Sequence, residues 1–258
     1  MRWVLFASLV TACGRLGFDA ERAATDAPPG GDGPRDSAID ASIDSAVDAP
    51  PDGASVLALV QTTPVAPSAG GPVTAALPVA STAGTLLVAS VATNDPTSLA
   101  FPAGWIVAVQ ATVSGGCAST IAYLPDNPGG ITTVMFTVNA GIPMEAVVTE
   151  WSGASPTSPV DVTGIGGSST PQTAQTVQTA ASTSAAGDFG VVVFCEDNNT
   201  PTYTPGPGWT NFGSYSATSA YPSFTTDRRE GLPLGVVSAT ETSSVGGKYQ
   251  AAIATFKP

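Results

Sequence analysis

Hydrophobic and polar residues in this chain follow the short period of β-strands, not the longer period of a helix. Residues 131–138, Ile-Thr-Thr-Val-Met-Phe-Thr-Val, alternate in part between apolar and polar, as a strand with one buried face does. Turn-forming residues separate such stretches, as in the Pro-Asp-Asn-Pro-Gly-Gly sequence of residues 125–130. No window shows a convincing 3.6-residue period. Many short strands with regular turns predict an all-β sandwich or barrel.

The strand pattern occurs twice. Three segments of a first copy match a second copy: residues 83–91 with 186–194, Gly104-Trp105 with Gly208-Trp209, and residues 145–151 with 250–256. The offsets are nearly constant, at 103 (84 to 187), 104 (105 to 209) and 105 (145 to 250). Tyr123 matches Tyr221 less well, because their offset is 98. The near-constant offset indicates an internal duplication.

The duplication and the strand pattern predict one large two-sheet antiparallel β-sandwich, of jelly-roll or immunoglobulin-like type, over residues 54–258. Its halves are expected at about 54–153 and 154–258. A second arrangement stays open, in which two tandem immunoglobulin-like domains join at the Ser-, Thr- and Pro-rich residues 152–182. A body of about 200 residues buries roughly 70% of its unfolded surface, enough for a core of its own.

The first twelve residues, 1–12, have the pattern of an export signal. Arg2 supplies a positive charge, and residues 3–10 form an apolar run too short to span a bilayer. Residues 10–13, Val-Thr-Ala-Cys, resemble the lipobox of bacterial lipoproteins. The resemblance implies cleavage before Cys13, lipid on its sulfur and amino group, and a membrane anchor. Gly14, in place of the Asp that favours inner-membrane retention in this family, predicts the outer membrane and exposure at the surface.

An acidic segment follows the cysteine. Residues 20 to about 53 contain almost no large apolar side chains, and from Asp32 to Asp52 an aspartate recurs every four residues. On a helix this spacing would stack like charges on one face, and prolines break both ends. We therefore expect a disordered tether over residues 13–53 that spaces the folded part from the membrane. Calcium binding is the weaker interpretation, because known calcium loops place acidic residues two apart.

Four segments carry a second resemblance: residues 84–88, 149–153, 158–163 and 253–256. Together they resemble a recurrent bacterial extracellular β-sandwich domain of unassigned function, over roughly residues 55–258. The resemblance implies a fold and an exposed location, and no chemistry. The Asp-Ser-x-Gly-Asn type of turn that is common before the second strand is replaced here by Phe-Pro-Ala-Gly-Trp at residues 101–105.

The composition of the chain excludes several classes of function. The chain has no histidine, and 20 acidic against 8 basic residues give a net charge of −12. We expect no nucleic-acid partner and no basic patch for anionic lipids, because both need clustered Lys and Arg. The lack of histidine removes Ser-His-Asp triads, Cys-His pairs and histidine metal sites. No Gly-rich phosphate loop opens a helix. We expect neither a metal nor a cofactor.

Carboxylates are the remaining candidates for chemistry. A glycosidase needs two of them across a sugar bond, and the candidates are Glu150, Asp161, Glu196 and Asp197. Glu150 matches Thr255 in the second copy, so a structural role at a strand end is favoured. Glu196 and Asp197 begin an acidic loop that suits an ordinary turn better than a calcium site, because it supplies too few oxygens. We expect no catalytic residue.

Aromatic residues offer a binding hypothesis. Trp105 and Trp209 are duplicated, so we expect both to pack in the core. Tyr203, Tyr215 and Tyr221 make the second half richer in aromatic rings, which would stack on sugars if they were exposed on one face.

Cys117 and Cys195 are the only cysteines after Cys13 and form the candidate disulfide of an exported chain, with two free buried thiols as the alternative. Cys195 ends the first core strand of the second half, and Cys117 precedes the third core strand of the first half. If sequential strands alternate in direction, a bond requires the halves to pack upside-down to one another.

These observations favour a non-enzymatic lipoprotein, anchored in the membrane and exposed at the cell surface, whose sandwich serves adhesion, display or envelope structure. Its partners would be the membrane and a glycan or another surface protein. A carbohydrate-binding module is the alternative, and exposed tyrosines on one face would favour it. A histidine-free glycan-active enzyme is the third hypothesis, which two carboxyl groups ~5–10 Å apart in a groove would favour.

Overall fold

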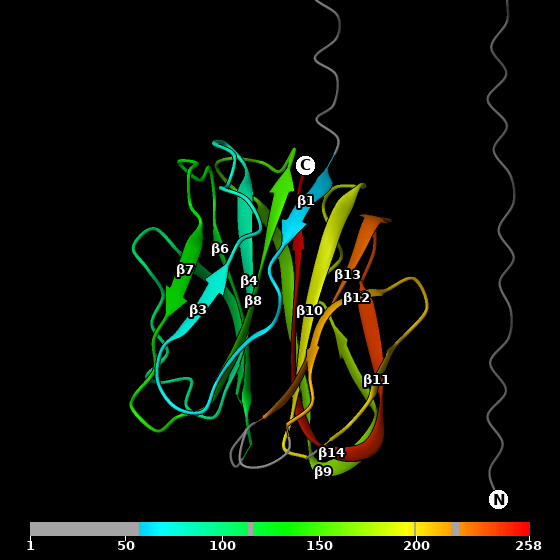
Figure 1. Cartoon of the computed structure of the whole chain (residues 1–258). Coiled ribbons are helices and arrows are strands. Elements are labelled where there is room, and N and C mark those ends of the chain that lie inside the picture. The colour runs from blue at the N-terminus through cyan, green and yellow to red at the C-terminus, as the bar shows by residue number, and fades with distance from the viewer. Residues whose placement is uncertain (1–56, 113–115, 199, 218–221) are drawn as a thin grey trace, which may run out of the picture. The chain divides into compact units, whose positions relative to one another are not determined.

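Fourteen strands and no helix make up the described part of the computed structural model, which covers residues 57–112, 116–198, 200–217 and 222–258. These residues belong to one compact unit, Ala49–Pro258. The predicted export signal, lipid-bearing Cys13 and tether lie outside the described residues. The strands form two antiparallel six-stranded sheets and one two-stranded sheet (Figure 1). The all-β, two-sheet prediction is confirmed.

The first half supplies one six-stranded sheet, in the order β1-β8-β4-β6-β5 with β2 beside β8. Its strands are β1 (Ala58–Thr62), β2 (Ala66–Ser68), β4 (Leu86–Thr93), β5 (Ile106–Thr112), β6 (Ala118–Leu124) and β8 (Met144–Ser152). β3 (Val73–Ala76) and β7 (Thr133–Phe136) form the two-stranded sheet. All eight residues of β4 are buried, because both faces of this central strand are covered.

The second half repeats this order, with β14-β10-β13-β12 in the place of β8-β4-β6-β5 and β9 in the place of β1. Its strands are β9 (Val160–Gln178), β10 (Asp188–Glu196), β11 (Tyr203–Pro205), β12 (Thr210–Tyr215), β13 (Ser223–Leu232) and β14 (Ser238–Phe256). β9 and β14 have 19 residues each, so their paired far ends also supply the layer that β3 and β7 form in the first half. Residues 152–182, the junction of the tandem alternative, contain β9 of the second sheet, and one core cluster joins residues of both halves, so that alternative is wrong.

Strand pairing gives the duplication a residue-level register. Leu86 of β4 lies opposite Trp151 of β8, and Phe189 of β10 lies opposite Phe256 of β14. The equivalent residues are 103 (86 to 189) and 105 (151 to 256) positions apart, as in the sequence.

Tyr123 has no tyrosine counterpart. It lies opposite Val88 of β4, whereas Arg228 lies opposite Val191 of β10. Val88 and Val191 are equivalent, with an offset of 103 (88 to 191), so the counterpart of Tyr123 is Arg228. The match with Tyr221 was wrong, because it relied on the same residue type and not on the position in the strand pairing.

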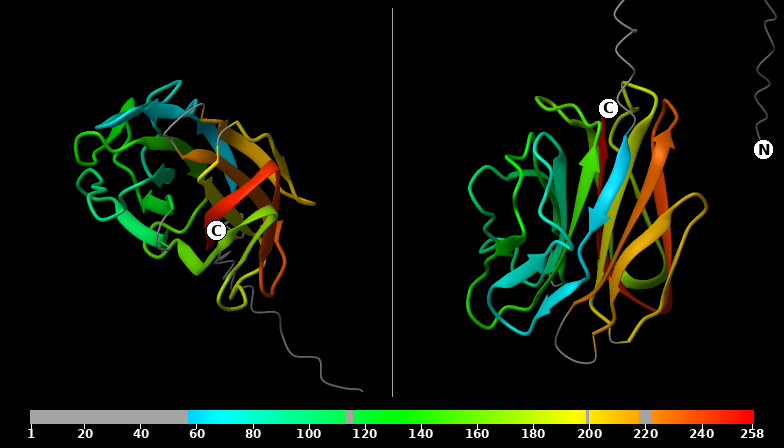
Figure 2. Two further views of the ribbon diagram at one scale, coloured as in Figure 1. Left: turned by 90° about the horizontal axis from the view of Figure 1, so that it is seen from below. Right: turned by 45° about the horizontal axis from the view of Figure 1, so that its top comes forward.

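The two large sheets pack face to face over a shared core. Trp151 stacks on Phe189 with ring centroids 3.8 Å apart, and Phe189 stacks on Phe256 at 4.9 Å. The outer face of the first sheet packs against β3 and β7 through residues such as Val73 and Phe136. The outer face of the second sheet packs against the far ends of β9 and β14. Figure 2 shows these layers from two further directions.

Cys117 and Cys195 are joined in a disulfide, with their Cα atoms 6.0 Å apart. Ala118 at the start of β6 lies opposite Thr93 at the end of β4. Cys117 therefore lies at the end of β4, and Cys195 lies near the end of the equivalent strand β10. The bond joins corresponding ends of the halves, so the expected upside-down packing is wrong. Sequential strands do not simply alternate, because β6 lies between β4 and β5 and makes those two run in the same direction.

Candidate functional site

A Gly-Trp turn carries an aromatic ring to the outer face of each large sheet. The glycine has a positive φ in both halves, 89° in the first and 80° in the second, a conformation that residues with a Cβ rarely adopt. The Trp105 N–H donates to the Pro102 carbonyl at 3.3 Å, and the Trp209 N–H donates to the Gly206 carbonyl at 3.1 Å. The two tryptophans therefore leave equivalent turns.

In the second half this ring is buried, as predicted. Trp209 is 7% exposed and lies over Gly190 of β10, where a Cβ atom would come within 3.0 Å of the indole. Its Nε1–H donates to the Ser238 carbonyl at 3.1 Å. The missing side chain of Gly190 thus makes room for the ring, and Ser238 satisfies the only hydrogen-bond donor of the indole.

In the first half the ring is only half-buried. The equivalent of Gly190 is Leu87, whose buried side chain fills the space that the glycine leaves free. Trp105 instead meets the core edge-on through Phe136, with ring centroids 5.8 Å apart and planes at 88°. The prediction that Trp105 packs in the core is therefore right in part, and the sequence signal that separates the two tryptophans is the Leu87–Gly190 difference.

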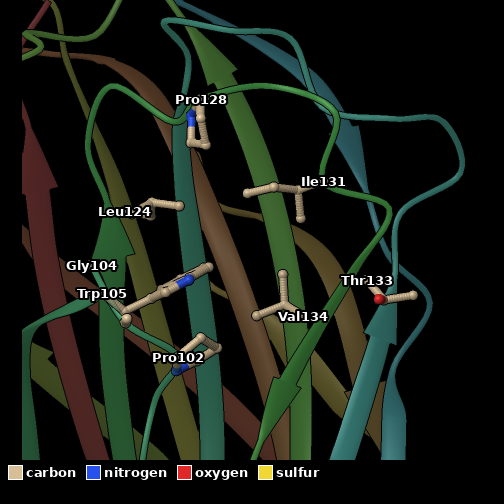
Figure 3. A pocket seen from close by; sticks show the side chains of 9 residues that line it. Pro102, Gly104, Trp105, Leu124, Pro128, Ile131, Thr133 and Val134 are labelled. Carbon is tan, nitrogen blue, oxygen red and sulfur yellow. The ribbon is translucent and has the colours of Figure 1, made fainter.

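Beside Trp105 the surface is hollowed into a groove of about 400 Å³ (Figure 3). Its lining comes from the turn before β5, the end of β6 and the segment that leads into β7, and includes Pro102, Trp105, Leu124, Pro128, Ile131 and Val134. Figure 3 shows the side chains of Trp105 and Leu124 facing those of Ile131 and Val134. A second hollow of about 340 Å³ shares Pro102 and Thr133 with the first and continues past Phe101 and Met135.

The groove is uncharged. Its lining side chains are aromatic, aliphatic or proline, apart from the hydroxyls of Thr133 and Thr137. Such a surface offers contact area to an uncharged ligand, with few polar groups to orient it. It holds no ionisable side chain that could act as a general acid or base.

Tyr203 and Tyr215, two of the three candidate ligand-facing tyrosines, are each half-buried. β11 pairs with β14, and the Tyr203 hydroxyl is buried, without a hydrogen-bond partner among the described residues. Burial raises the pKa of this phenol. Tyr215 packs against the shared core, and Tyr221 lies outside the described residues. The ring that borders a groove is instead that of Trp105.

Glu150 has the bonds of a structural carboxylate. Its Oε1 accepts hydrogen bonds from the Thr82 N–H at 2.7 Å and from the Thr85 hydroxyl at 2.8 Å, and its Oε2 accepts one from Gln61. The interpretation of Glu150 as a strand-end carboxylate agrees with these contacts. Asp161 likewise accepts a hydrogen bond from a backbone N–H.

The acidic loop after β10 divides its side chains between interior and solvent. Glu196 is buried and accepts a hydrogen bond from Gln175, whereas Asp197 accepts one from the backbone N–H of Lys248 at 2.8 Å. Both carboxylates are thus held by protein groups, as in an ordinary turn. Within the described ranges, no group of three or more His, Cys, Asp or Glu side chains is arranged to hold a metal ion.

Sequence reasoning missed a set of buried carboxyl groups. Burial raises the pKa of Glu145 to about 9, and burial together with the neighbouring Asp227 raises that of Glu241 to about 9. Burial raises the pKa of Asp227 as well, and raises that of Asp188 to about 7 with a contribution from Asp161. The sequence did not show that both faces of these strands are covered, because the covering layers come from distant parts of the chain.

Comparison of the chain with protein-family models, with curated proteins and with solved structures finds no match. None of the described residues belongs to a helix that is long and apolar enough to cross a membrane. The two copies within the chain can be compared with each other, at Trp105 and Trp209 above all.

Proposed function

We propose that this chain is a lipid-anchored, non-enzymatic binding protein of the cell envelope, and that the groove of its first half receives an uncharged ligand. One observation carries the proposal: two equivalent copies of one fold are closed over Trp209 and open beside Trp105. Filling a hollow of this size stabilises a fold, as the packing over Trp209 illustrates, so a hollow left beside an accessible indole supports a binding role.

The anchor in this proposal is Cys13, and residues 13–53 act as the tether. The support is the Val-Thr-Ala-Cys sequence of residues 10–13 with its preceding apolar run, and Gly14 supports the outer membrane as the location. The sandwich would then be displayed at the surface for adhesion or capture.

A binding screen tests the proposal. The purified full chain is offered neutral glycans and uncharged peptides, and ligands that bind are measured against Trp105→Ala. We expect Trp105→Ala to weaken binding at least about tenfold, because an aromatic ring at the centre of a contact carries much of the binding energy. Ile165→Ala is the matched control, since Ile165 is 63% exposed on β9 and does not line the groove. Equal loss in both variants, or none in either, contradicts the proposal.

A carbohydrate-binding module is the second candidate. It is favoured by the half-buried Trp105 with the Thr133 hydroxyl nearby, since sugar rings stack on indoles and bond to hydroxyls. Binding of neutral glycans alone, lost in Trp105→Ala, would select this candidate.

A further inference from the structure

The chain covers the outer edge of β7 only in part, beside the groove. Thr137, just after β7, exchanges two backbone hydrogen bonds with Ala100, at 2.8 and 3.1 Å, on the side that faces away from β3. Backbone groups alternate in direction along an antiparallel strand, so those of Met135 and Thr133 point to the same side as those of Thr137. Both residues are exposed; Thr133 lines both hollows, and Met135 lines the second.

In the second half the chain covers the same edge with its own backbone. β11 runs along β14, and just beyond it the Gly206 N–H donates to the Thr240 carbonyl at 2.7 Å. The Trp209 indole then donates to the Ser238 carbonyl at 3.1 Å. Successive carbonyls on this edge thus receive donors from one extended segment and its turn.

The first half lacks the equivalent of the Gly206–Thr240 hydrogen bond, because Pro102 stands in the place of the donor. It stands at the position of Gly206, two residues before the Gly-Trp dipeptide, and has no N–H to donate. Met135 stands at the position of Thr240, with an offset of 105 (135 to 240), and the described residues supply no donor to its carbonyl. The carbonyl of Thr133, the equivalent of the one that receives the indole bond, also has no donor from the described part of the chain.

We infer that this edge and the groove together bind an extended peptide segment, which adds to β7 as a strand and places an apolar side chain beside Trp105. The inference rests on the proposed binding role of the groove and names its ligand. The second half supports a peptide, because an extended segment occupies the equivalent edge there. Backbone groups on an open edge give affinity, and a pocket lined by Leu124 and Val134 selects the side chain.

The test uses the full chain and a set of labelled six-residue peptides with alternating apolar and polar residues. Each peptide is made in ordinary form and in two N-methylated forms, one for each alternate set of backbone nitrogens. We expect ordinary peptides to bind and one of the two methylated forms to bind at least about tenfold more weakly. The reason is that only one edge of an added strand pairs with β7, and each lost backbone bond costs roughly three- to tenfold.

A variant of the chain tests the same edge from the other side. Pro102→Ala restores an N–H at the position of Gly206, so the chain can cover its own Met135 carbonyl. We expect it to weaken peptide binding by about tenfold without lowering the midpoint of thermal unfolding. Pro156→Ala is the matched control, because Pro156 is an exposed proline that lines neither hollow; we expect less than about a threefold effect.

Four results separate the outcomes. Equal binding of the ordinary peptide and both methylated forms overturns the inference. Glycan binding that depends on Trp105, without peptide binding, overturns the inference and leaves the proposed function standing. A dimer that Met135→Pro dissociates overturns the peptide in favour of a second copy of the chain. No binding of any ligand overturns both the inference and the proposed function.

Discussion

At the scale of the residue, two differences decide which half is open. Leu87 fills the space that Gly190 leaves to an indole, and Pro102 lacks the N–H that Gly206 donates. Neither difference changes the pairing register of its sheet. Each was visible in the sequence as a mismatch between the copies, but its meaning depends on knowing which atoms lie above the position.

Buried carboxyl groups make stability depend on pH. The pKa of Glu145 and that of Glu241 are raised by burial from an ordinary 4.5 to about 9. The folded chain therefore holds protons that the unfolded chain releases, so stability is full below about pH 4.5 and falls as the pH rises towards 9. We expect a lower free energy of unfolding at about pH 8.5 than at about pH 5. The lowered pKa values of Asp95 and Asp161 act only at more acidic pH.

Glu145→Gln isolates one of these groups. The neutral amide cannot ionise, so we expect it to flatten the pH dependence and to raise the free energy of unfolding at about pH 8.5 by roughly 1–3 kcal/mol. The reason is that the wild-type carboxyl must take up a proton on folding at that pH, whereas the amide need not. Urea unfolding at both pH values measures this. The matched control is Glu230→Gln, an exposed carboxylate paired with Arg228, with an expected effect under about 0.5 kcal/mol. Parallel pH profiles for wild type and Glu145→Gln would show that Glu145 is not the cause.

At the scale of the element, the sequence predicted strands, turns and their duplication, because alternation, Gly-Trp and Ala-Gly are local signals. It did not predict which strands pair. The order β4-β6-β5 puts the third core strand beside the first, and the direction of the Cys117–Cys195 link follows from that order. Pairing is set by which edges and faces become buried, and no local pattern reports that.

In the candidate site, too, the local features could be predicted from the sequence and the contacts between distant segments could not. The Gly-Trp turns were recognisable from the sequence, but the groove was not, because it needs the end of β6 and the start of β7 brought beside Trp105. Tyr203 was a candidate ligand-facing ring, and its hydroxyl is buried because β11 is paired into the second sheet. The residue types alone were thus enough to predict the Gly-Trp turns, but not to predict which aromatic ring borders a groove.

At the scale of the whole molecule, we propose a sandwich with one open half that is anchored through Cys13. If the anchor forms, cells that express the chain and are fed a fatty-acid analogue should label it through Cys13. We expect Cys13→Ala to abolish the label and Cys117→Ala, at a cysteine of the disulfide, to keep it. Equal labelling of wild type and Cys13→Ala would remove the anchor from the proposal.

The central claim is that the first half binds and the second half is closed. Its most direct test is an NMR titration of the isotope-labelled full chain with the tightest ligand from the binding screen. The account predicts that the Trp105 indole N–H and the backbone amides of Thr133 and Met135 shift, and that the Trp209 indole and the Ser238 amide do not. Shifts centred on Trp209 and Ser238, with Trp105 unchanged, would contradict it.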